Sequence, residues 1–434
     1  MSWSLRYAIK SYVLSAIWTA PVIAVVLEQV TFRIAYVHQL DFGWIPGFVV
    51  NREGTIALAD YLISSSIAFV VFTFSSLIVA IQVASGQLTP RIIATTLLRD
   101  RVIRWSVGLF VYVLLLAIGI KARVDTVPRF LVSTSAIFGL VSVVAFMFLI
   151  DHAARLLRPV NIVWRLAQQG LVVIDDVYPD PIPPSSIPPQ APEDLGPPER
   201  TILHTGSSAI LIAVNLKALV AEAKREDVII ELVPRVGDFV AKDDALFRLR
   251  GRGATQLADR FLRGQVAFGR ERTIEQDSTF ASRVIVDIAI KALSPAINDP
   301  TTAVIAIDQL QRLLRTVGKR DLRNDWIRDG DGKVRVIFGT PDWEDFVHLT
   351  FREVRHYGAG NFQVVRRLRA MIENILQSLP ESRLPAVRQE RELLDRTVEK
   401  LYMFPEDLAL ARIPDPQGLG GGSAPIQMPS RPAK

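Results

Sequence analysis

The chain has 434 residues, half of them hydrophobic and 22% charged, with a formal net charge of +6. It contains no cysteine, which excludes disulfides, thiolate zinc sites, cysteine-ligated iron–sulfur clusters and a cysteine nucleophile. A chain of this length exceeds what one hydrophobic core usually organises, so we expect two or more folding units.

The first 155 residues contain four apolar stretches long enough to cross a bilayer. We predict an all-α four-helix transmembrane bundle in residues 1–155, with helices at about 12–30, 61–83, 105–120 and 130–150. The first stretch is long for a secretory signal and no small-x-small cleavage site follows it, so we expect it to be retained. Pro21 within it is tolerable, because neighbouring groups in a bilayer helix satisfy the freed carbonyl.

Arginines and lysines in the short flanks of these stretches predict the orientation. Nine fall on one side of the membrane and five on the other. The nine are Arg6, Lys10, Arg91, Arg99, Arg101, Arg104, Arg155, Arg158 and Arg165, and the five are Arg33, Arg52, Lys121, Arg123 and Arg129. Since cytoplasmic loops carry the excess, both termini are expected in the cytoplasm. This distribution fits membrane orientation better than nucleic-acid binding, so no nucleic-acid partner is expected.

The second stretch carries a polar stripe. At about 100° per residue, Ser64, Ser75, Gln82 and Thr89 fall on one narrow face of the helix. Two interpretations stay open: contact with another helix through small and hydroxyl residues, or the lining of a water-filled path. Glu28 and Asp60 lie at the ends of their stretches, so no span is expected to carry a charge at its centre. A proton relay is correspondingly disfavoured.

Four further segments follow the membrane part. We predict a juxtamembrane helix at 156–178, a linker at 179–199, a cytoplasmic α+β domain at 200–411 and a disordered glycine- and proline-rich tail at 412–434. Nine prolines in residues 179–198 make the linker an extended, semi-rigid spacer. Its PxxP-like patterns leave recognition by another domain as the alternative.

The α+β domain opens with strands at Ile210–Val214 and Val228–Leu232 around a helix at Leu216–Lys224. A tight turn at Gly237-Asp238 then predicts a hairpin of Val236–Val240 with Ala245–Phe247. A strand at Val334–Phe338 and helices at Trp343–Val354, Gln363–Leu379 and Leu384–Leu401 complete the domain. The cluster of Arg366, Arg367 and Arg369 is expected to be a solvated face.

The densest polar segment lies between Phe268 and Leu314. A helix at Phe280–Leu293 carries charges of alternating sign at spacing four, and Asp299 and Pro300 start the next helix, which continues over Thr301–Arg315. The polar candidates are Glu271, Arg272, Gln276, Asp277, Arg283, Asp287, Lys291, Asn298 and Asp299. They form either a structural network or a set that converges on a ligand or a second subunit.

Four phrases of this sequence resemble a known family. They are Ser85-Gly-Gln-Leu-Thr-Pro-Arg91, Arg235-Val-Gly-Asp-Phe-Val240, Glu271-Arg-Thr273 with Gln276-Asp277, and Ala292-Leu-Ser-Pro-Ala-Ile-Asn-Asp-Pro-Thr-Thr-Ala303. The chain is similar over residues ~5 to ~410 to a bacterial family of predicted membrane proteins of unknown function. The resemblance implies a bacterial inner-membrane location. It implies no activity, substrate or catalytic residue.

Enzyme signatures are scarce in the sequence. The five histidines are scattered without metal-ligand spacing, and no HExxH, Walker A, GxSxG or GxGxxG motif occurs. We therefore expect no catalytic residue, metal or cofactor. The preferred hypothesis is an ion channel or transporter with a regulatory cytoplasmic domain. Because four helices are too few to enclose a wide path, it requires a homo-oligomer with the polar stripe at the symmetry axis. The alternative is a membrane-anchored sensor or scaffold whose cytoplasmic domain binds a ligand or protein.

Overall fold

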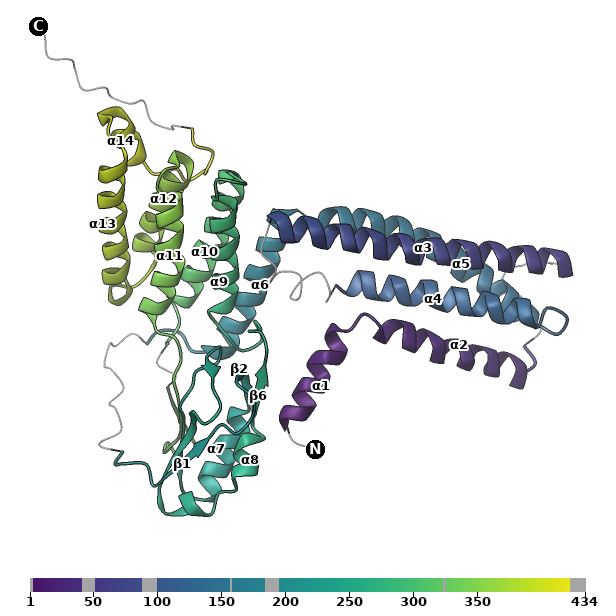
Figure 1. Ribbon diagram of the computed structural model, residues 1–434, viewed down its shortest axis with the longest axis horizontal. Coiled ribbons are helices and arrows are strands. Elements are labelled where there is room, and N and C mark those ends of the chain that lie inside the picture. Colours follow the sequence, from purple (N-terminus) through teal and green to yellow (C-terminus); the bar gives the residue numbers. More distant parts are fainter. Residues whose placement is uncertain are drawn as a thin grey trace, which may run out of the picture. The chain divides into compact units, whose positions relative to one another are not determined.

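The computed structural model describes residues 3–40, 51–87, 100–156, 158–183, 195–322 and 325–421 (Figure 1). The chain divides into two compact units. The helical unit comprises Ser11–Gly86 and Pro90–Ile162. The α+β unit comprises Val163–Lys434 with the short segments Met1–Lys10 and Gln87–Thr89. The predicted fold class, an all-helical part followed by a mixed α+β part, is confirmed.

Four helices of the helical unit are long and apolar enough to cross a membrane. They are α2 (Thr19–Val37), α3 (Arg52–Gln87), α4 (Arg101–Ala122) and α5 (Arg129–Leu156). α3 begins before its predicted boundary at residue 61, because its first turns are polar but still helical. Arg52 at its start pairs with Asp125 at 2.7 Å, in the loop that follows α4.

The first apolar stretch is not one continuous helix, so its predicted bounds at 12–30 are wrong. Helix α1 (Trp3–Ser15) ends before residues 16–18, and α2 starts at Thr19 after the N-cap residue Trp18. Pro21 therefore lies in the first turn of α2, where a residue without an N–H loses no helical hydrogen bond. The span is shifted toward the C-terminus by about two turns.

Aromatic side chains fill the interior of the helical unit. Phe69 stacks on Phe146 with ring centroids 4.2 Å apart, and the Phe110 ring lies 5.3 Å from that of Phe69. α2 and α4 approach closely at Gly119, where an added Cβ would come 2.6 Å from the Phe32 ring. Close packing through small residues is what associates helices in a bilayer, and it makes these four helices one bundle.

The described part of the α+β unit contains two sheets. The larger has the order β1-β5-β3-β8-β7 and the smaller β4-β2-β6. The strands are β1 (Arg200–Leu203), β2 (Ala209–Val214), β3 (Ile229–Leu232), β4 (Phe239–Val240), β5 (Ala245–Arg250), β6 (Val266–Gly269), β7 (Trp326–Arg328) and β8 (Val334–Phe338). β3 and β8 run parallel, and the other neighbouring strands are antiparallel. Their buried residues, among them Ile230, Phe247 and Val336, form one apolar core.

The predicted hairpin of 236–240 with 245–247 is wrong. β4 pairs with β2, whereas β5 pairs with β1 and β3, so the two strands belong to different sheets. The turn itself is present, and the Gly237 N–H donates to the Leu211 carbonyl of β2 at 2.8 Å. A local turn signal cannot distinguish a hairpin from a chain that crosses to a second sheet.

Helices α9 to α13 pack beside one another in this unit (Figure 1). The helices are α6 (Pro159–Val177), α7 (Leu216–Arg225), α8 (Asp259–Arg263), α9 (Phe280–Ala292), α10 (Pro300–Val317), α11 (Trp343–Gly358), α12 (Phe362–Ser378), α13 (Leu384–Leu401) and α14 (Pro405–Ala411), with short 3-10 turns at Arg252–Thr255 and Glu381–Arg383. Asp299 accepts from the Thr302 N–H at 3.0 Å and so caps α10, which begins at Pro300 as its start signal predicts.

The arginine cluster of α12 is buried, so its prediction as a solvated face is wrong. Arg366 is 0% exposed, and Arg367 and Arg369 are also buried. The Arg366 guanidinium donates to the carbonyls of Ile413, Gly420 and Gly421 at 2.9–3.1 Å. Arginine is buried where its donors are satisfied, and here the acceptors come from backbone far along the chain.

Those acceptors belong to the segment predicted as a disordered tail, and for residues 412–421 that prediction is wrong. Asp415 is 2% exposed and its carboxylate accepts from the N–H groups of Gln417, Gly418 and Gly420. The proline-rich linker is likewise tied down at its described ends. The Ile182 N–H donates to the Lys319 carbonyl, and the Glu199 N–H donates to the Leu249 carbonyl, each at 2.9 Å.

Candidate functional site

The predicted polar stripe lies on the exposed side of α3. Ser64, Ser75 and Gln82 are all exposed in the single chain, and Thr89 lies outside the described residues. The same side presents Ala68, Val71 and Ile78, at alternating spacings of four and three. We call these six residues the outward face of α3. None of the side chains of Ser64, Ser75 and Gln82 makes a hydrogen bond within the described residues.

The opposite side of α3 packs inside the bundle. Leu62, Ser66, Thr73 and Leu77 are buried there. The Thr73 hydroxyl donates to the Phe69 carbonyl at 2.7 Å, whereas the Ser66 hydroxyl has no partner among the described residues. Among the described residues, packing therefore uses this side of α3, and Ser64, Ser75 and Gln82 stay exposed.

A buried carboxylate in the helical unit was missed by the sequence reasoning. Glu28 is the tenth of the 19 residues of α2 and is 7% exposed. Gln29 Nε2 donates to its carboxylate at 2.6 Å, and an added Cβ on Gly119 would lie 3.3 Å from Glu28 Oε1. The prediction of no charge at the centre of a span is wrong for α2, because the break at residues 16–18 shifts the helix. On the neighbouring helix α4, the residue beside Glu28 is Gly119, which lies within one turn of the end of α4 at Ala122.

The nine polar residues predicted in the α+β unit lie in three places along α9. Glu271, Arg272, Gln276 and Asp277 precede the helix, Arg283 and Asp287 lie on it, and Lys291, Asn298 and Asp299 lie near its end and before α10. The set therefore does not gather at a single point. Gln276 Oε1 accepts from the Val214 N–H at 2.8 Å and pins the first group to β2.

The middle group joins two helices. Arg283 pairs with Asp287 on α9 and with Glu353 on α11, where Nη2 lies 2.7 Å from the Glu353 carboxylate. The hydrogen bond from Arg283 lowers the pKa of Glu353. The last group shapes the chain between helices: Asn298 adopts φ +48°, a left-handed conformation that asparagine tolerates, and Asp299 then caps α10. Both groups have a sufficient structural role.

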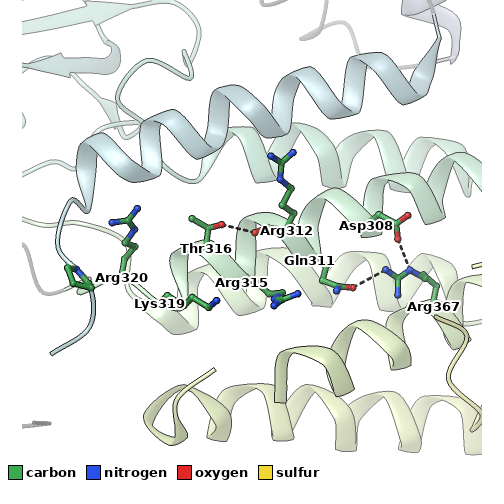
Figure 2. Close-up of a pocket in the computed structure, with 9 residues that line it drawn as sticks. Asp308, Gln311, Arg312, Arg315, Thr316, Lys319, Arg320 and Arg367 are labelled. Carbon is green, nitrogen blue, oxygen red and sulfur yellow. Dashed lines mark hydrogen bonds and ion pairs between the residues drawn. The ribbon is translucent and has the colours of Figure 1, made fainter. Parts of the chain in front are cut away.

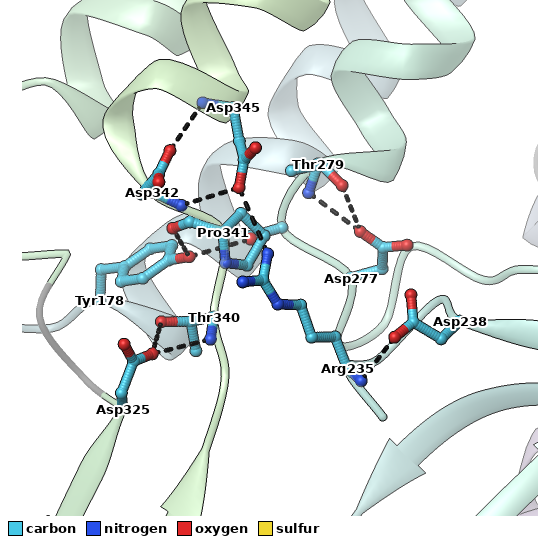
Figure 3. Close-up of polar contacts among 11 residues, drawn as sticks. Tyr178, Arg235, Asp238, Asp277, Thr279, Asp325, Thr340, Pro341, Asp342 and Asp345 are labelled. Atoms are coloured by element: carbon cyan, nitrogen blue, oxygen red, sulfur yellow. Dashed lines mark hydrogen bonds and ion pairs between the residues drawn. The ribbon is translucent and has the colours of Figure 1, made fainter. Parts of the chain in front are cut away.

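The first group contains a buried carboxylate, Asp277. Asp277 is 4% exposed, and its Oδ1 accepts from the Thr279 N–H, the Thr279 hydroxyl and the Phe280 N–H at 2.7–3.1 Å (Figure 3). Its Oδ2 has no hydrogen-bond donor among the described residues and lies 3.7 Å from Arg272 Nη1. Burial raises the pKa of Asp277, against the opposing hydrogen bond from Thr279.

The turn at Gly237 lies directly against this carboxylate. Gly237 has φ +96°, and an added Cβ would come 2.6 Å from Asp277 Oδ2 and 3.3 Å from Arg272 Cζ. The fold thus brings together two phrases that are 31 residues or more apart in the sequence, Arg235–Val240 and Glu271–Asp277. We call this contact the Asp277 junction.

Tyr178, just after α6, lies beside the junction. Its hydroxyl donates to the Pro341 carbonyl at 3.0 Å and lies 3.4 Å from Ser278 Oγ (Figure 3). Burial raises the pKa of Tyr178 to about 12, so the phenol stays protonated. Asp325 accepts from the Thr340 N–H at 2.8 Å nearby. The junction therefore ties the end of α6 to the segments that lead into α9 and α11.

The described residues contain no group of three or more histidine, aspartate or glutamate side chains placed to hold a metal ion. At the Asp277 junction the carboxylate is occupied in capping α9, and the neighbouring phenol is locked to a backbone carbonyl. These groups are positioned for holding elements together rather than for moving a proton to a substrate.

Replacing Asp277 with asparagine is expected to remove one pH-dependent contribution to stability. A carboxyl whose folded pKa is raised stabilises the fold below its ordinary pKa, and this contribution is lost as pH rises through the folded value. Relative to the unchanged chain, the free energy of unfolding of Asp277→Asn should therefore increase between about pH 4 and pH 7. Urea unfolding followed at several pH values measures this difference. A difference that is flat or falls with pH contradicts the expectation.

Comparison with known proteins identifies the family. A family described as "Predicted membrane protein (DUF2254)" matches residues 10–374. The chain belongs to this family. An uncharacterised protein of Mycobacterium bovis and uncharacterised proteins of two Mycobacterium tuberculosis strains are each 25% identical to it over 453 residues, covering 98% of this chain and 83% of theirs. No solved structure matches the chain.

Family membership confirms the resemblance to predicted membrane proteins of unknown function, and the four apolar helices fit this description. In this family member the structure adds a site that the sequence reasoning did not name, a pocket with a cationic lining at the end of α10 (Figure 2). Its sequence signal is the spacing of Arg312, Arg315 and Lys319, which places basic side chains on one side of a helix end.

Proposed function

We propose that the protein is a homo-oligomeric ion channel or transporter of the bacterial inner membrane, with a regulatory cytoplasmic α+β unit. The observation that carries this proposal is the outward face of α3. It presents two serines and a glutamine, which make no hydrogen bond within the described chain, among the apolar residues Ala68, Val71 and Ile78 of the same face. Hydrocarbon offers such groups no partner, whereas a second copy or water in a path between copies would supply one.

The spacing of the outward face supports contact between copies. Its residues recur at alternating intervals of four and three, the repeat by which two helices pack along a seam, and Ser64, Ala68 and Ser75 are small enough for close approach. Cyclic symmetry would bring α3 of every copy to one axis. With its 36 residues, α3 is about 54 Å long and can cross the ~30 Å hydrocarbon core with turns to spare.

In the described part of the helical unit, aromatic side chains occupy the interior of a single chain. The rings of Phe69, Phe110 and Phe146 meet across the bundle. A cavity lined by Thr73, Ser76 and neighbouring apolar residues has a volume of about 20 Å³, enough for about one water. A conducting path is therefore better placed between copies. The nine-to-five excess of arginine and lysine supports cytoplasmic termini and a cytoplasmic α+β unit.

Cysteine cross-linking tests the arrangement, because the natural chain has no cysteine. We expect Ser75→Cys in liposomes to give a covalent dimer upon mild oxidation, since the symmetry axis brings the two sulfurs together. Phe72→Cys and Phe74→Cys are matched controls on the same exposed helix, about 80° to either side of the middle of the outward face, and should cross-link far less. Equal cross-linking at all three positions, or none at Ser75→Cys, would exclude this interface.

The same liposomes carry the functional measurement. Ion flux through the unchanged protein should change when Gln82→Leu removes the amide, whereas Val79→Leu, exposed on the flank of the same helix, should leave it unchanged. If the protein cross-links at Ser75→Cys but passes no common ion, the channel hypothesis is rejected and only the oligomeric interface is supported.

A membrane-anchored sensor is the second candidate. The cationic pocket of the α+β unit favours it, because a regulatory or sensing unit needs a place for a ligand and a simple tether does not. In that case the helical unit could be exchanged for an unrelated anchor without loss of function, which a channel would not survive.

A further inference from the structure

The pocket at the end of α10 is lined mainly by charged side chains. It has a volume of about 480 Å³, within the range of small-molecule sites. Its lining includes the cations Arg312, Arg315, Lys319, Arg320 and Arg367, against a single carboxylate, Asp308. Figure 2 shows these side chains in a row along the helix and the turn that follows it, with Arg367 at the Asp308 end.

Two of the five cations are neutralised within the chain. Arg367 is buried, and its Nε donates to Asp308 at 2.6 Å while its Nη2 donates to Gln311 Oε1 at 2.9 Å. Arg320 pairs with Asp175 of α6. These contacts fix two walls of the pocket and cancel their charges.

The other three cations have no carboxylate partner among the described residues. Arg312 is held by a neutral group: with the Gln168 amide oxygen turned toward it, both terminal nitrogens donate at 2.7 Å. Arg315 and Lys319 make no ion pair within the described chain. The five cations of the lining and their two carboxylate partners, Asp308 and Asp175, together carry a formal charge of +3.

A structural explanation accounts for part of this charge. Cations near a helix C-terminus interact favourably with the helix dipole, which suffices for Arg315 and Lys319 at the end of α10. The helix dipole does not explain Arg312, which lies more than a turn inside the helix. Nor does it explain why Arg367 of α12, held by Asp308 and Gln311, lines the same pocket. Convergence of guanidinium groups from different elements is the arrangement that recognises phosphate oxygens.

We propose that this pocket binds a small anion that carries at least two phosphate groups. Three uncompensated charges in a row exceed what one phosphate would need, and the lining includes no aromatic ring on which a base could stack. The chemistry is shared by a soluble polyphosphate and by a lipid headgroup with two phosphates. The inference deepens the sensor candidate and does not require that the helical unit conduct ions.

Calorimetry on the full chain in phosphatidylcholine nanodiscs, with inorganic pyrophosphate as the probe at fixed ionic strength, tests the pocket. Arg315→Gln with Lys319→Gln removes two cations and no side-chain hydrogen bond or ion pair within the described chain. We expect affinity to fall about 100-fold, tenfold for each charged contact. The matched control, Arg391→Gln with Arg396→Gln on the exposed side of α13, removes the same charge and should bind as the unchanged chain does.

Nanodiscs in which part of the lipid is cardiolipin distinguish the two sources. Loss of pyrophosphate binding there assigns the pocket to the headgroup, and unchanged binding assigns it to a soluble anion. The proposal is overturned if the unchanged chain binds no pyrophosphate, or if the double variant binds it as tightly as the control does. Arg312→Gln serves as a second variant if the first unfolds early on heating. Pyrophosphate binding without ion flux would reject the channel alone, and flux without binding would reject this pocket alone.

Discussion

The Arg366→Ala variant is expected to lose about 3–5 kcal/mol of unfolding free energy in the α+β unit. The side chain is 0% exposed and donates to three backbone carbonyls, of Ile413, Gly420 and Gly421. Alanine leaves these acceptors without donors and opens a cavity of nearly a whole side chain, and each effect alone is costly.

The measurement is urea unfolding of the full chain in detergent, followed by hydrogen exchange over residues 412–421. Exchange should rise first in this segment, because the Arg366 side chain donates three of the hydrogen bonds that fasten it to α12. Arg391→Ala on α13 is the control: it removes an exposed arginine and should change stability by less than about 0.5 kcal/mol. Arg366→Lys keeps the charge but not the fork of donors, and should fall between the two. A loss no larger than that of Arg391→Ala would show that the segment is held by other contacts.

The burial of Arg366 shows where sequence reasoning fails in this chain. The helix itself was predicted, because Val364, Leu368 and Ile375 recur at helical spacing on α12. The buried environment of Arg366 could not be predicted, because its acceptors are backbone carbonyls 47–55 residues away. They lie in a segment whose glycines and prolines indicate disorder. Every residue type carries a backbone carbonyl, so the sequence does not indicate which carbonyls accept from Arg366.

The same distinction holds for the membrane part and the candidate sites. Four apolar stretches and the polar face of α3 follow from composition and a 3.6-residue period, so both could be predicted. The helix break before Thr19 could not be predicted. Because this break shifts α2 along the chain, the central position and burial of Glu28 could not be predicted either. The sequence predicts a turn at Gly237 and marks Asp277 as a polar candidate. Their contact depends on β4 crossing to the second sheet, which a local turn pattern does not specify. Pairings between distant segments are the information that a single sequence lacks.

Gly237→Ala is expected to cost about 3 kcal/mol, from two sources at one position. A φ of +96° is strained for any residue with a Cβ, and the new methyl group would come 2.6 Å from Asp277 Oδ2, which must then move within a buried site. Gly330→Ala is the matched control: no atom lies within 4 Å of its added Cβ and its φ is not positive, so stability should hardly change.

A double-mutant cycle separates the two sources. Asp277→Ser shortens the side chain and removes Oδ2 while keeping an oxygen to cap α9, so it relieves the clash but not the backbone strain. If the clash matters, Gly237→Ala in the Asp277→Ser background should cost at least about 1 kcal/mol less than in the natural chain. Additive costs would mean that backbone strain alone fixes the glycine. A coupled result would show that the turn at Gly237 and the start of α9 are energetically coupled through Asp277. Because Tyr178 after α6 bonds to Pro341 before α11 beside this contact, a movement of α6 or α11 there would then be expected to affect the turn as well.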